Sequence, residues 1–147
     1  EPHFLPGLLK KVRAVGRYYR IGNGQNRVSL THVDNAAHAH VQAAARLASD
    51  SDLGGRAFFV TDPEAVKIWQ WVVEILRRQG LGNSRERTVP YGIAYAVAAC
   101  LEAAYHLTKD DRCPPITRFL VNQLGRTHTY RSEIAASAFG YAPSVEK

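Results

Sequence analysis

The sequence predicts an α/β fold, because short apolar segments alternate along it with helical patterns. Residues 28–33 read as a strand that runs straight into a helix over residues 35–48, capped by Asp34 or Asn35. The helix opens with small residues, which allow a helix to lie close against a flat layer. Residues 56–60 are apolar on both faces, as in a covered parallel strand. Such strands are too few and too short to complete a doubly wound sheet alone.

Apolar spacing and glycines define the N-terminal elements. Apolar residues recur at helical intervals over residues 5–15 with lysines opposite them, which predicts an amphipathic helix that ends at Gly16. Residues 18–21 are predicted to form a strand. A turn over residues 22–26 follows, because its glycines tolerate a positive φ.

The later elements are predicted in the same way. Residues 61–64, Thr-Asp-Pro-Glu, have the composition of a helix start, and the helix after them has one apolar face and ends near Gly80. The further predicted elements are an extended piece over 87–90, an Ala-rich helix over 91–107, a helix over 116–124, an extended piece over 128–130 and a last helix capped by Ser132 and ending at Gly140.

Composition and charge indicate a soluble globular protein. Of the 147 residues, 46% are apolar and 22% are charged, which argues against disorder. The formal net charge is +6, but the basic residues are scattered and no RNA-binding aromatic motif or zinc-finger spacing accompanies them. We therefore expect no nucleic-acid partner. The longest apolar run, residues 91–101, is shorter than the ~20 residues of a membrane span, so no integral span is expected.

The two cysteines, Cys100 and Cys113, fit neither a zinc site nor a disulfide framework. A reducing, cytoplasmic location is therefore expected. The chain starts at Glu1 and contains no methionine, and we expect it to be a piece of a longer protein.

Two motifs imitate the machinery of cofactor-dependent enzymes. Gly22-x-Gly24 could open a dinucleotide-binding loop, but Arg27 stands where the third glycine should be and a strand follows, so a plain turn is the better interpretation. Tyr105 and Lys109 have the spacing at which a lysine lowers the pKa of a catalytic tyrosine. No serine or threonine lies about a dozen residues upstream to complete that set, and we interpret the spacing as chance. No catalytic or cofactor-binding residue is therefore assigned.

The histidines near the predicted strand end raise the question of a metal. His38 and His40 point roughly 200° apart on a helix, so they cannot readily share one ion, and no metal site is expected. Arg27 follows a glycine-rich turn and precedes a strand, where an arginine could pair with a phosphate or a carboxylate.

Several segments together resemble the C-terminal half of an extended short-chain dehydrogenase/reductase. The nearest branch is the 3β-hydroxysteroid dehydrogenase family, with its bacterial sterol- and oxoacyl-reductase relatives. The most specific block is residues 27–40, RVSLTHVDNAAHAH. Supporting blocks are GRAFFVTD at 55–62, FGYAP at 139–143, WQW at 69–71, PIT at 115–117 and LPGLL at 5–9.

The resemblance implies a partial Rossmann-type fold, made of its C-terminal strand and helices, with the smaller, mainly helical substrate-binding lobe of an extended short-chain dehydrogenase over residues 1–147. NAD or NADP would be bound by an N-terminal half that is absent here. The whole enzyme, a possible homodimer, would transfer a hydride between NAD(P) and a secondary alcohol or ketone of a bulky hydrophobic substrate. By analogy, the substrate-binding residues would be His3, Phe4, Leu5 and Leu8 at the pocket mouth, and Arg27, which stands where sugar-nucleotide members bind phosphate.

Two alternatives stay open. A sugar-nucleotide epimerase or dehydratase would need a second phosphate-binding arginine, for which Arg85 or Arg87 is a weak candidate. A non-catalytic binding module would use the net positive charge of the chain. We expect the chain alone to be inactive and to expose apolar surface around residues 58–60, since these should pack against the missing sheet.

Overall fold

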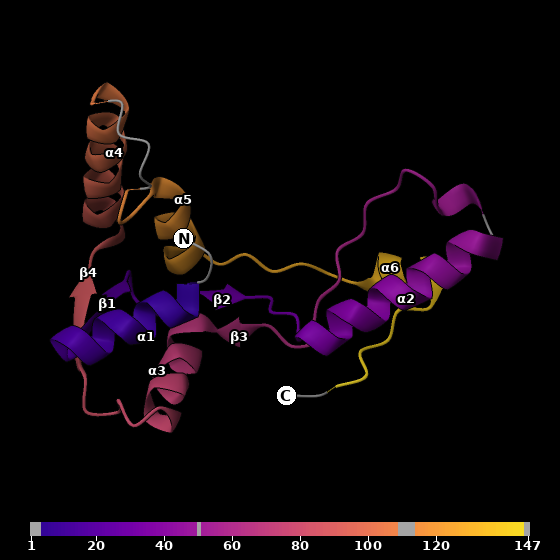
Figure 1. Ribbon diagram of the computed structural model, residues 1–147, viewed down its shortest axis with the longest axis horizontal. Coiled ribbons are helices and arrows are strands. Elements are labelled where there is room, and N and C mark those ends of the chain that lie inside the picture. The colour runs from indigo at the N-terminus through magenta and orange to yellow at the C-terminus, as the bar shows by residue number, and fades with distance from the viewer. Residues whose placement is uncertain (1–3, 50, 109–113, 146–147) are drawn as a thin grey trace. The chain divides into compact units, whose positions relative to one another are not determined.

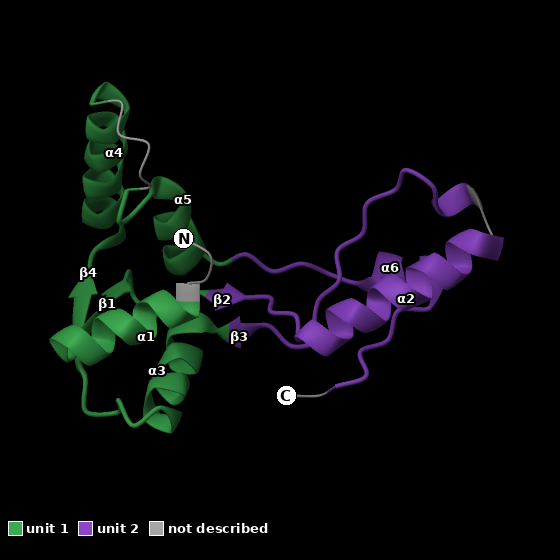
Figure 2. Cartoon of the chain, in the orientation of Figure 1, with its two compact units in different colours: residues 1–26, 67–127 green, residues 27–66, 128–147 purple. Residues whose placement is uncertain are grey.

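The computed structural model describes residues 4–49, 51–108 and 114–145. The chain forms two compact units, and each is built from two separate stretches of sequence (Figure 2). The first unit comprises residues 1–26 and 67–127, and the second comprises residues 27–66 and 128–147. The fold is mixed α/β, with several helices and a small parallel sheet (Figure 1).

The first unit is organised around two parallel strands. Strand β1 (Arg17–Ile21) pairs with β4 (Arg85–Val89) in a register that sets Arg17 opposite Arg85 and Ile21 opposite Val89. Helix α1 (Phe4–Val15) leads into β1, and α4 (Tyr91–Leu107) follows β4 directly. The unit is completed by α3 (Ile68–Arg78) and α5 (Arg118–Gly125).

Every helix of this unit buries apolar side chains. Because α3 carries its apolar residues on one face, Trp69, Val72 and Leu76 are all buried. Alanines take the buried positions of α4, where Ala98 is fully inaccessible. The other buried apolar residues of the unit are Val12, Tyr18, Ile21, Ile68, Ala94, Val121 and Leu124.

The second unit contains α2 (Val33–Ser49), a single 3₁₀ turn η1 (Ser51–Leu53) and α6 (Glu133–Phe139). Its core comprises Ala39, Leu53, Ala135, Phe139 and Tyr141. The Phe58 ring packs edge-on against Phe139, with ring centroids 5.3 Å apart. Strand β2 (Arg27–Val28) pairs with β3 (Val66–Lys67), and Val28 also forms a parallel bridge with His128.

Most predicted elements are confirmed to within two or three residues. The helices over 5–15, 91–107, 116–124 and after Ser132 are present, and the extended piece over 87–90 is part of β4. Gly22 and Gly24 both adopt a positive φ of 74°, which confirms the plain turn. No helix in the described ranges is long and apolar enough to cross a membrane.

Strand prediction fared worse in the second unit. The strand expected over 28–33 stops at Val28, and the helix begins already at Val33. Residues 56–60 form no strand, because a strand is defined by a hydrogen-bonded neighbour and apolarity alone does not supply one. Phe59 is 60% exposed, so this segment is not covered on both faces.

The helix start expected at residues 61–64 is also wrong. The third helix begins at Ile68, after β3. Asp62 is 5% exposed and does not cap α3. Its carboxylate accepts hydrogen bonds from the His32 backbone N–H and from the Asn35 side chain.

Candidate functional site

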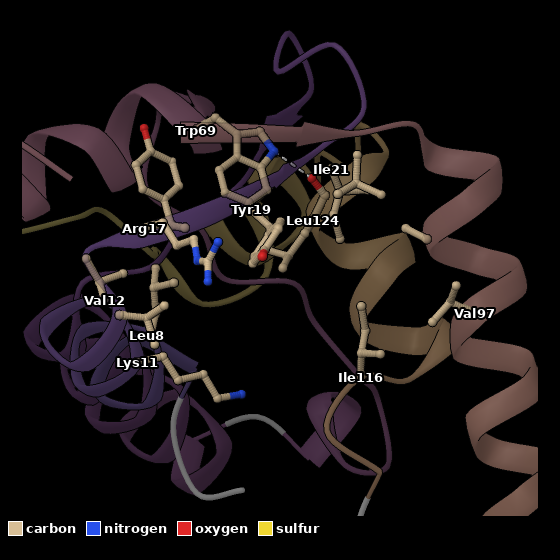
Figure 3. A pocket seen from close by; sticks show the side chains of 14 residues that line it. Leu8, Lys11, Val12, Arg17, Tyr19, Ile21, Trp69, Val97, Ile116 and Leu124 are labelled. Atoms are coloured by element: carbon tan, nitrogen blue, oxygen red, sulfur yellow. Dashed lines mark hydrogen bonds between the residues drawn. The ribbon is translucent and has the colours of Figure 1, made fainter. Parts of the chain in front are cut away.

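A cavity of about 570 Å³ opens in the first unit, and its walls are almost entirely apolar (Figure 3). Helices α1, α4 and α5, strand β1 and the first turn of α3 all contribute to it. The side chains that line it are Leu8, Lys11, Val12, Val15, Arg17, Tyr18, Tyr19, Ile21, Trp69, Val89, Ala94, Val97, Ile116 and Leu124.

Helical periodicity places the α1 residues on the cavity wall. Leu8, Lys11, Val12 and Val15 follow one another at intervals of three, one and three positions, which puts them on one face of a helix. Gly16 then takes a positive φ of 67° and turns the chain directly into β1. The tight turn holds the helix against the strand that forms the adjoining wall.

The Trp69 indole is fixed in place as part of this wall. Its Nε1 donates a buried hydrogen bond of 2.9 Å to the backbone carbonyl of Leu124, at the end of α5. Asn26, itself 6% exposed, donates from Nδ2 to the carbonyls of Leu124 and Arg126 at 3.2 and 3.3 Å. The last carbonyls of a helix lack partners within the helix, so these donors satisfy them and fasten α5 to the rest of the unit.

Tyr18 lines the cavity as a neutral group. Its hydroxyl donates to Glu86 Oε2 at 2.9 Å. Burial, with the hydrogen bond and the charge of Glu86 in support, raises the pKa of Tyr18 to about 12. The hydroxyl therefore stays protonated at neutral pH and cannot serve there as a general base.

The cationic side chains of the cavity are Lys11 on α1 and Arg17 on β1. Figure 3 shows the Arg17 guanidinium directed into the space that the lining side chains enclose. None of the lining residues is an aspartate or a glutamate. The cavity therefore combines an apolar interior with positive charge.

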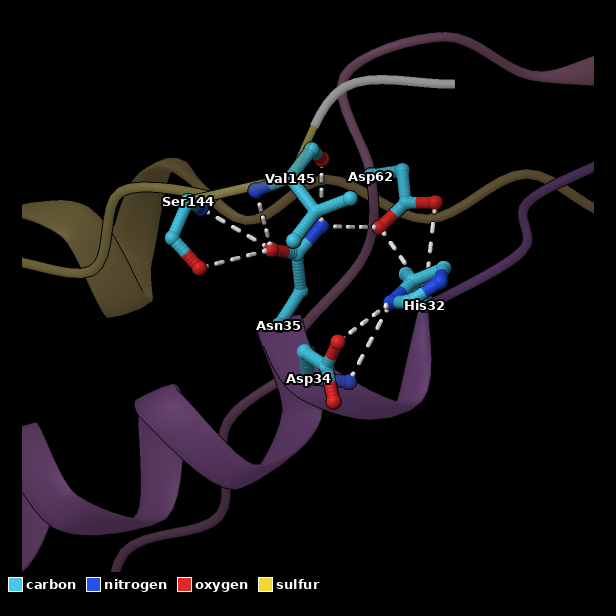
Figure 4. Close-up of polar contacts among 6 residues, drawn as sticks. All are labelled: His32, Asp34, Asn35, Asp62, Ser144 and Val145. Atoms are coloured by element: carbon cyan, nitrogen blue, oxygen red, sulfur yellow. Dashed lines mark hydrogen bonds and ion pairs between the residues drawn. The ribbon is translucent and has the colours of Figure 1, made fainter.

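The second unit holds a buried polar centre at the start of α2 (Figure 4). The fully buried Asn35 donates from Nδ2 to Asp62 Oδ1 and to the carbonyl of Val145, each at 2.9 Å. Its Oδ1 accepts from the backbone N–H groups of Ser144 and Val145, also at 2.9 Å. The amide thus uses its donors and acceptors to join the start of α2 to two other stretches of the chain, at Asp62 and at Ser144 and Val145, which gives it a structural role.

The predicted cap of this helix is corrected accordingly. Helix α2 begins one residue before Asp34, and the carbonyl of His32 accepts the hydrogen bond from Ala36 N. The His32 backbone N–H donates to both oxygens of Asp62, at 3.0 and 3.2 Å. The start of α2 was expected to be capped by Asp34 or Asn35. It is instead held by Asp62, which lies thirty positions after His32 in the sequence.

The histidines make local contacts. His32 Nδ1 lies 3.6 Å from Asp34 Oδ2, and His40 Nδ1 lies 2.7 Å from the carbonyl of Ala36. Among the described residues, no group of three histidine, cysteine or acidic side chains could hold a metal ion. Cys100 is a free, exposed thiol, whereas Cys113 and Lys109 lie outside the described residues.

The predicted substrate-binding residues are only partly assembled. Leu8 lines the cavity, and Leu5 lies on the same helix, half-buried, without lining it. Arg27 belongs to the second unit, where its Nη2 donates to the Ala65 carbonyl at 2.7 Å. His3 and the side chain of Phe4 lie outside the described residues. Sequence reasoning missed Arg17 and Trp69, since no local pattern shows that a strand start and a helix start face one cavity.

Comparison with known proteins places the chain. The sequence model of the 3-beta hydroxysteroid dehydrogenase/isomerase family matches residues 1–90. The chain belongs to this family. The resemblance seen in the sequence is thereby confirmed at the level of the family.

Similar proteins include a bacterial reductase and a mammalian dehydrogenase. The chain is 36% identical over 146 residues to a 2-alkyl-3-oxoalkanoate reductase of Shewanella oneidensis, matching 99% of the chain and 37% of that protein. It is 34% identical over 148 residues to the decarboxylating sterol-4-alpha-carboxylate 3-dehydrogenase of Mus musculus, matching 99% of the chain and 40% of that protein. The chain therefore spans about two fifths of the length of these relatives.

Proposed function

We propose that the chain supplies the substrate cavity of an NAD(P)-dependent oxidoreductase that interconverts a secondary alcohol and a ketone on a bulky hydrophobic substrate. The observation that carries the proposal is the cavity of about 570 Å³ in the first unit, whose walls suit a sterol or a long alkyl chain. Leu8, which lines the cavity, would contact the substrate, whereas His3, Phe4 and Leu5 are proposed as substrate-binding residues on the family resemblance alone.

The names of the relatives narrow the substrate class. One names a 3-oxoalkanoate with an alkyl group at position 2, and the other names a sterol with a carboxylate at position 4 that is dehydrogenated at position 3. In both molecules the reacting carbon is the β carbon of the carboxylic acid. We infer that the substrate here is a hydrophobic β-hydroxy or β-oxo acid.

The glycine turn of the first unit does not have the form of a dinucleotide-binding loop. The Gly22–Gly24 turn is followed by β2 and not by a helix, so it offers no helix N-terminus to a pyrophosphate. We propose that NAD or NADP, which supplies the hydride acceptor or donor, is bound by an N-terminal half of a longer cytoplasmic protein, and that this protein can dimerise through that half. The second unit would then be the last part of its Rossmann-type domain, and Arg27 is proposed as a substrate-binding residue on the family resemblance alone.

The apolar lining favours this reading over a sugar-nucleotide enzyme. Arg85 and Arg87 are exposed on β4, and neither lines the cavity. A nucleotide diphosphate would leave most of the lining without a partner, because aliphatic and aromatic side chains offer it no hydrogen bonds.

The test has two parts, and the first is to read the coding sequence upstream of Glu1 and express the whole protein that it encodes. We expect this protein, but not the 147-residue chain alone, to reduce NAD⁺ or NADP⁺ in the presence of a sterol or long-chain β-hydroxy acid. Ala98→Val, which adds volume at a fully buried position, is the matched control for general packing damage.

The second part compares two variants of that protein. Val97→Trp, which projects into the cavity, should raise KM well above the value of Ala98→Val at equal folded fraction. A whole protein that lacks nicotinamide-dependent activity, or a Val97→Trp variant with unchanged KM, would contradict the proposal.

A further inference from the structure

We propose that Arg17 is the residue that recognises the carboxylate of the ligand and so fixes which end of the molecule lies at the β1 wall of the cavity. The inference rests on the proposed function, since it assumes that the cavity binds a hydrophobic molecule. It adds a specificity-determining residue that neither the relatives nor the sequence motifs identify.

The first support is the position of the side chain. Arg17 opens β1 and projects its guanidinium into the cavity, whereas Val97 and Ile116 lie on the opposite side of the view (Figure 3). An elongated amphiphile could therefore place its anionic head at Arg17 and its apolar body against α4 and the start of α5. Such a molecule is the only simple ligand type whose two ends both find complementary surroundings here.

The second support is the charge around Arg17. Its partner in the strand register is another cation, Arg85, and no acidic side chain in the described part of the chain forms an ion pair or hydrogen bond with Arg17. Glu86, the adjacent acid on β4, is already engaged by Tyr18 and by Arg20, whose Nε lies 3.0 Å from it. The charge of Arg17 is thus left for a ligand.

The third support is the chemistry of the guanidinium. Its planar fork can donate two parallel hydrogen bonds to one carboxylate, and such charge-assisted pairs are stronger than neutral ones. Lys11 would add a second positive charge from α1, but an ammonium group acts as a point charge and selects no particular geometry. Because the carboxylate is β to the reacting carbon, a carboxylate held by Arg17 would also hold that carbon close to β1.

The experiment measures binding of dodecanoate and of 1-dodecanol, which share one alkyl chain, to the 147-residue chain. Tryptophan fluorescence reports binding, since Trp69 lines the cavity, and it is recorded in a Trp71→Phe background so that Trp69 is the sole indole. We expect dodecanoate to bind about 10- to 100-fold more tightly, as hydrogen bonds to a charged group typically provide. Arg17→Gln should abolish this preference while leaving the affinity for dodecanol within about twofold of wild type.

The matched control is Arg85→Gln, which removes the same charge from the register partner without touching the cavity and should keep the preference. Arg17→Lys should keep only part of it. Equal binding of the two ligands by wild type, or loss of the preference in Lys11→Gln but not in Arg17→Gln, would overturn the role of Arg17 while leaving the apolar cavity intact. If neither ligand binds wild type, the proposed function fails, and this inference fails with it.

Discussion

Replacing Asn35 with aspartate should unfold the second unit locally at neutral pH. The substitution keeps the size of the side chain and its acceptor oxygen, but it exchanges Nδ2 for a second oxygen. That oxygen would lie where Nδ2 now donates at 2.9 Å both to Asp62 Oδ1 and to the Val145 carbonyl. Two donated hydrogen bonds are lost, and two buried carboxylates are brought into contact.

The size of the effect follows from these contacts. Each lost hydrogen bond contributes about 1 kcal/mol, although Asp62 Oδ1 still accepts from the His32 N–H. An uncompensated buried charge costs about 3–5 kcal/mol when a partner is removed. We therefore expect a destabilisation of about 3–5 kcal/mol, which is a large share of the stability of a small unit.

The stability of the Asn35→Asp variant should also depend on pH. Two carboxylates in contact cannot both ionise easily, so the pKa of the pair in the folded variant is raised above its value in the unfolded chain. The folded variant then binds a proton more tightly than the unfolded one. Its stability should consequently rise as the pH falls through the raised pKa, until one proton is shared between the two groups.

Hydrogen exchange at the Ser144 and Val145 amides is the direct assay, because both amides donate to Asn35 Oδ1. The control is Asn23→Asp in the exposed turn of the first unit, where the side chain acts only as an acceptor, from Gln25 N. Unchanged exchange in Asn35→Asp, or exchange no faster than in Asn23→Asp, would refute the argument.

Three further substitutions or titrations test the first unit. Gly125→Ala should destabilise it by about 1–3 kcal/mol, measured by urea unfolding, because a Cβ there would meet the Tyr91 ring at 2.7 Å. The control Gly92→Ala on α4 has nothing within 4 Å of the new Cβ and should be neutral or stabilising by up to about 1 kcal/mol. Trp69→Phe should cost about 1–3 kcal/mol by leaving a buried carbonyl with one donor fewer, and an unchanged urea midpoint would contradict the role of the indole. The pKa of Tyr18, raised to about 12, means that the folded chain holds its proton more tightly than the unfolded chain, so stability should fall as the pH rises from 10 towards 12. An ultraviolet titration should show Tyr18 among the late tyrosines, together with Tyr141, whose pKa is raised by burial, and Glu86→Gln should make only Tyr18 titrate earlier.

The sequence predicted elements whose signals are local. Apolar spacing was enough for α1 and α4, and Thr117, whose Oγ1 accepts from Leu120 N, starts α5 within two residues of its expected position. Prediction from the sequence failed where a contact with a distant part of the chain determines the local structure. Residues 56–60 have the composition of a strand but pair with no other strand in the described part of the chain. Asp62 looks like a helix cap, yet it is recruited by the N–H of His32, thirty positions earlier.

The candidate site shows the same division. Leu8 could be named from a family resemblance, because it lies in a matching block near the start of the chain. Arg17 and Trp69 could not be named in this way. They line one cavity only after β1 has paired with β4 and after the Trp69 indole has bonded to the end of α5. Those pairings join residues more than fifty positions apart, and no pattern within one segment encodes them.

The parallel pairing of β1 with β4 cannot form until long after β1 has been synthesised. Tyr18 and Glu86, which face each other in that sheet, are 68 positions apart. A ribosome adding 5–20 residues per second would release the first strand roughly 3–14 s before its partner exists. During that interval Tyr18 and Ile21, which are buried in the finished unit, have α1 beside them but lack their partner strand.

Helix α5 arrives later still and contributes Leu124 to the cavity. The ligand site is therefore a property of the almost completed chain. A hydrophobic ligand could only assist the final stage of folding, and any protein truncated before α5 should lose binding altogether.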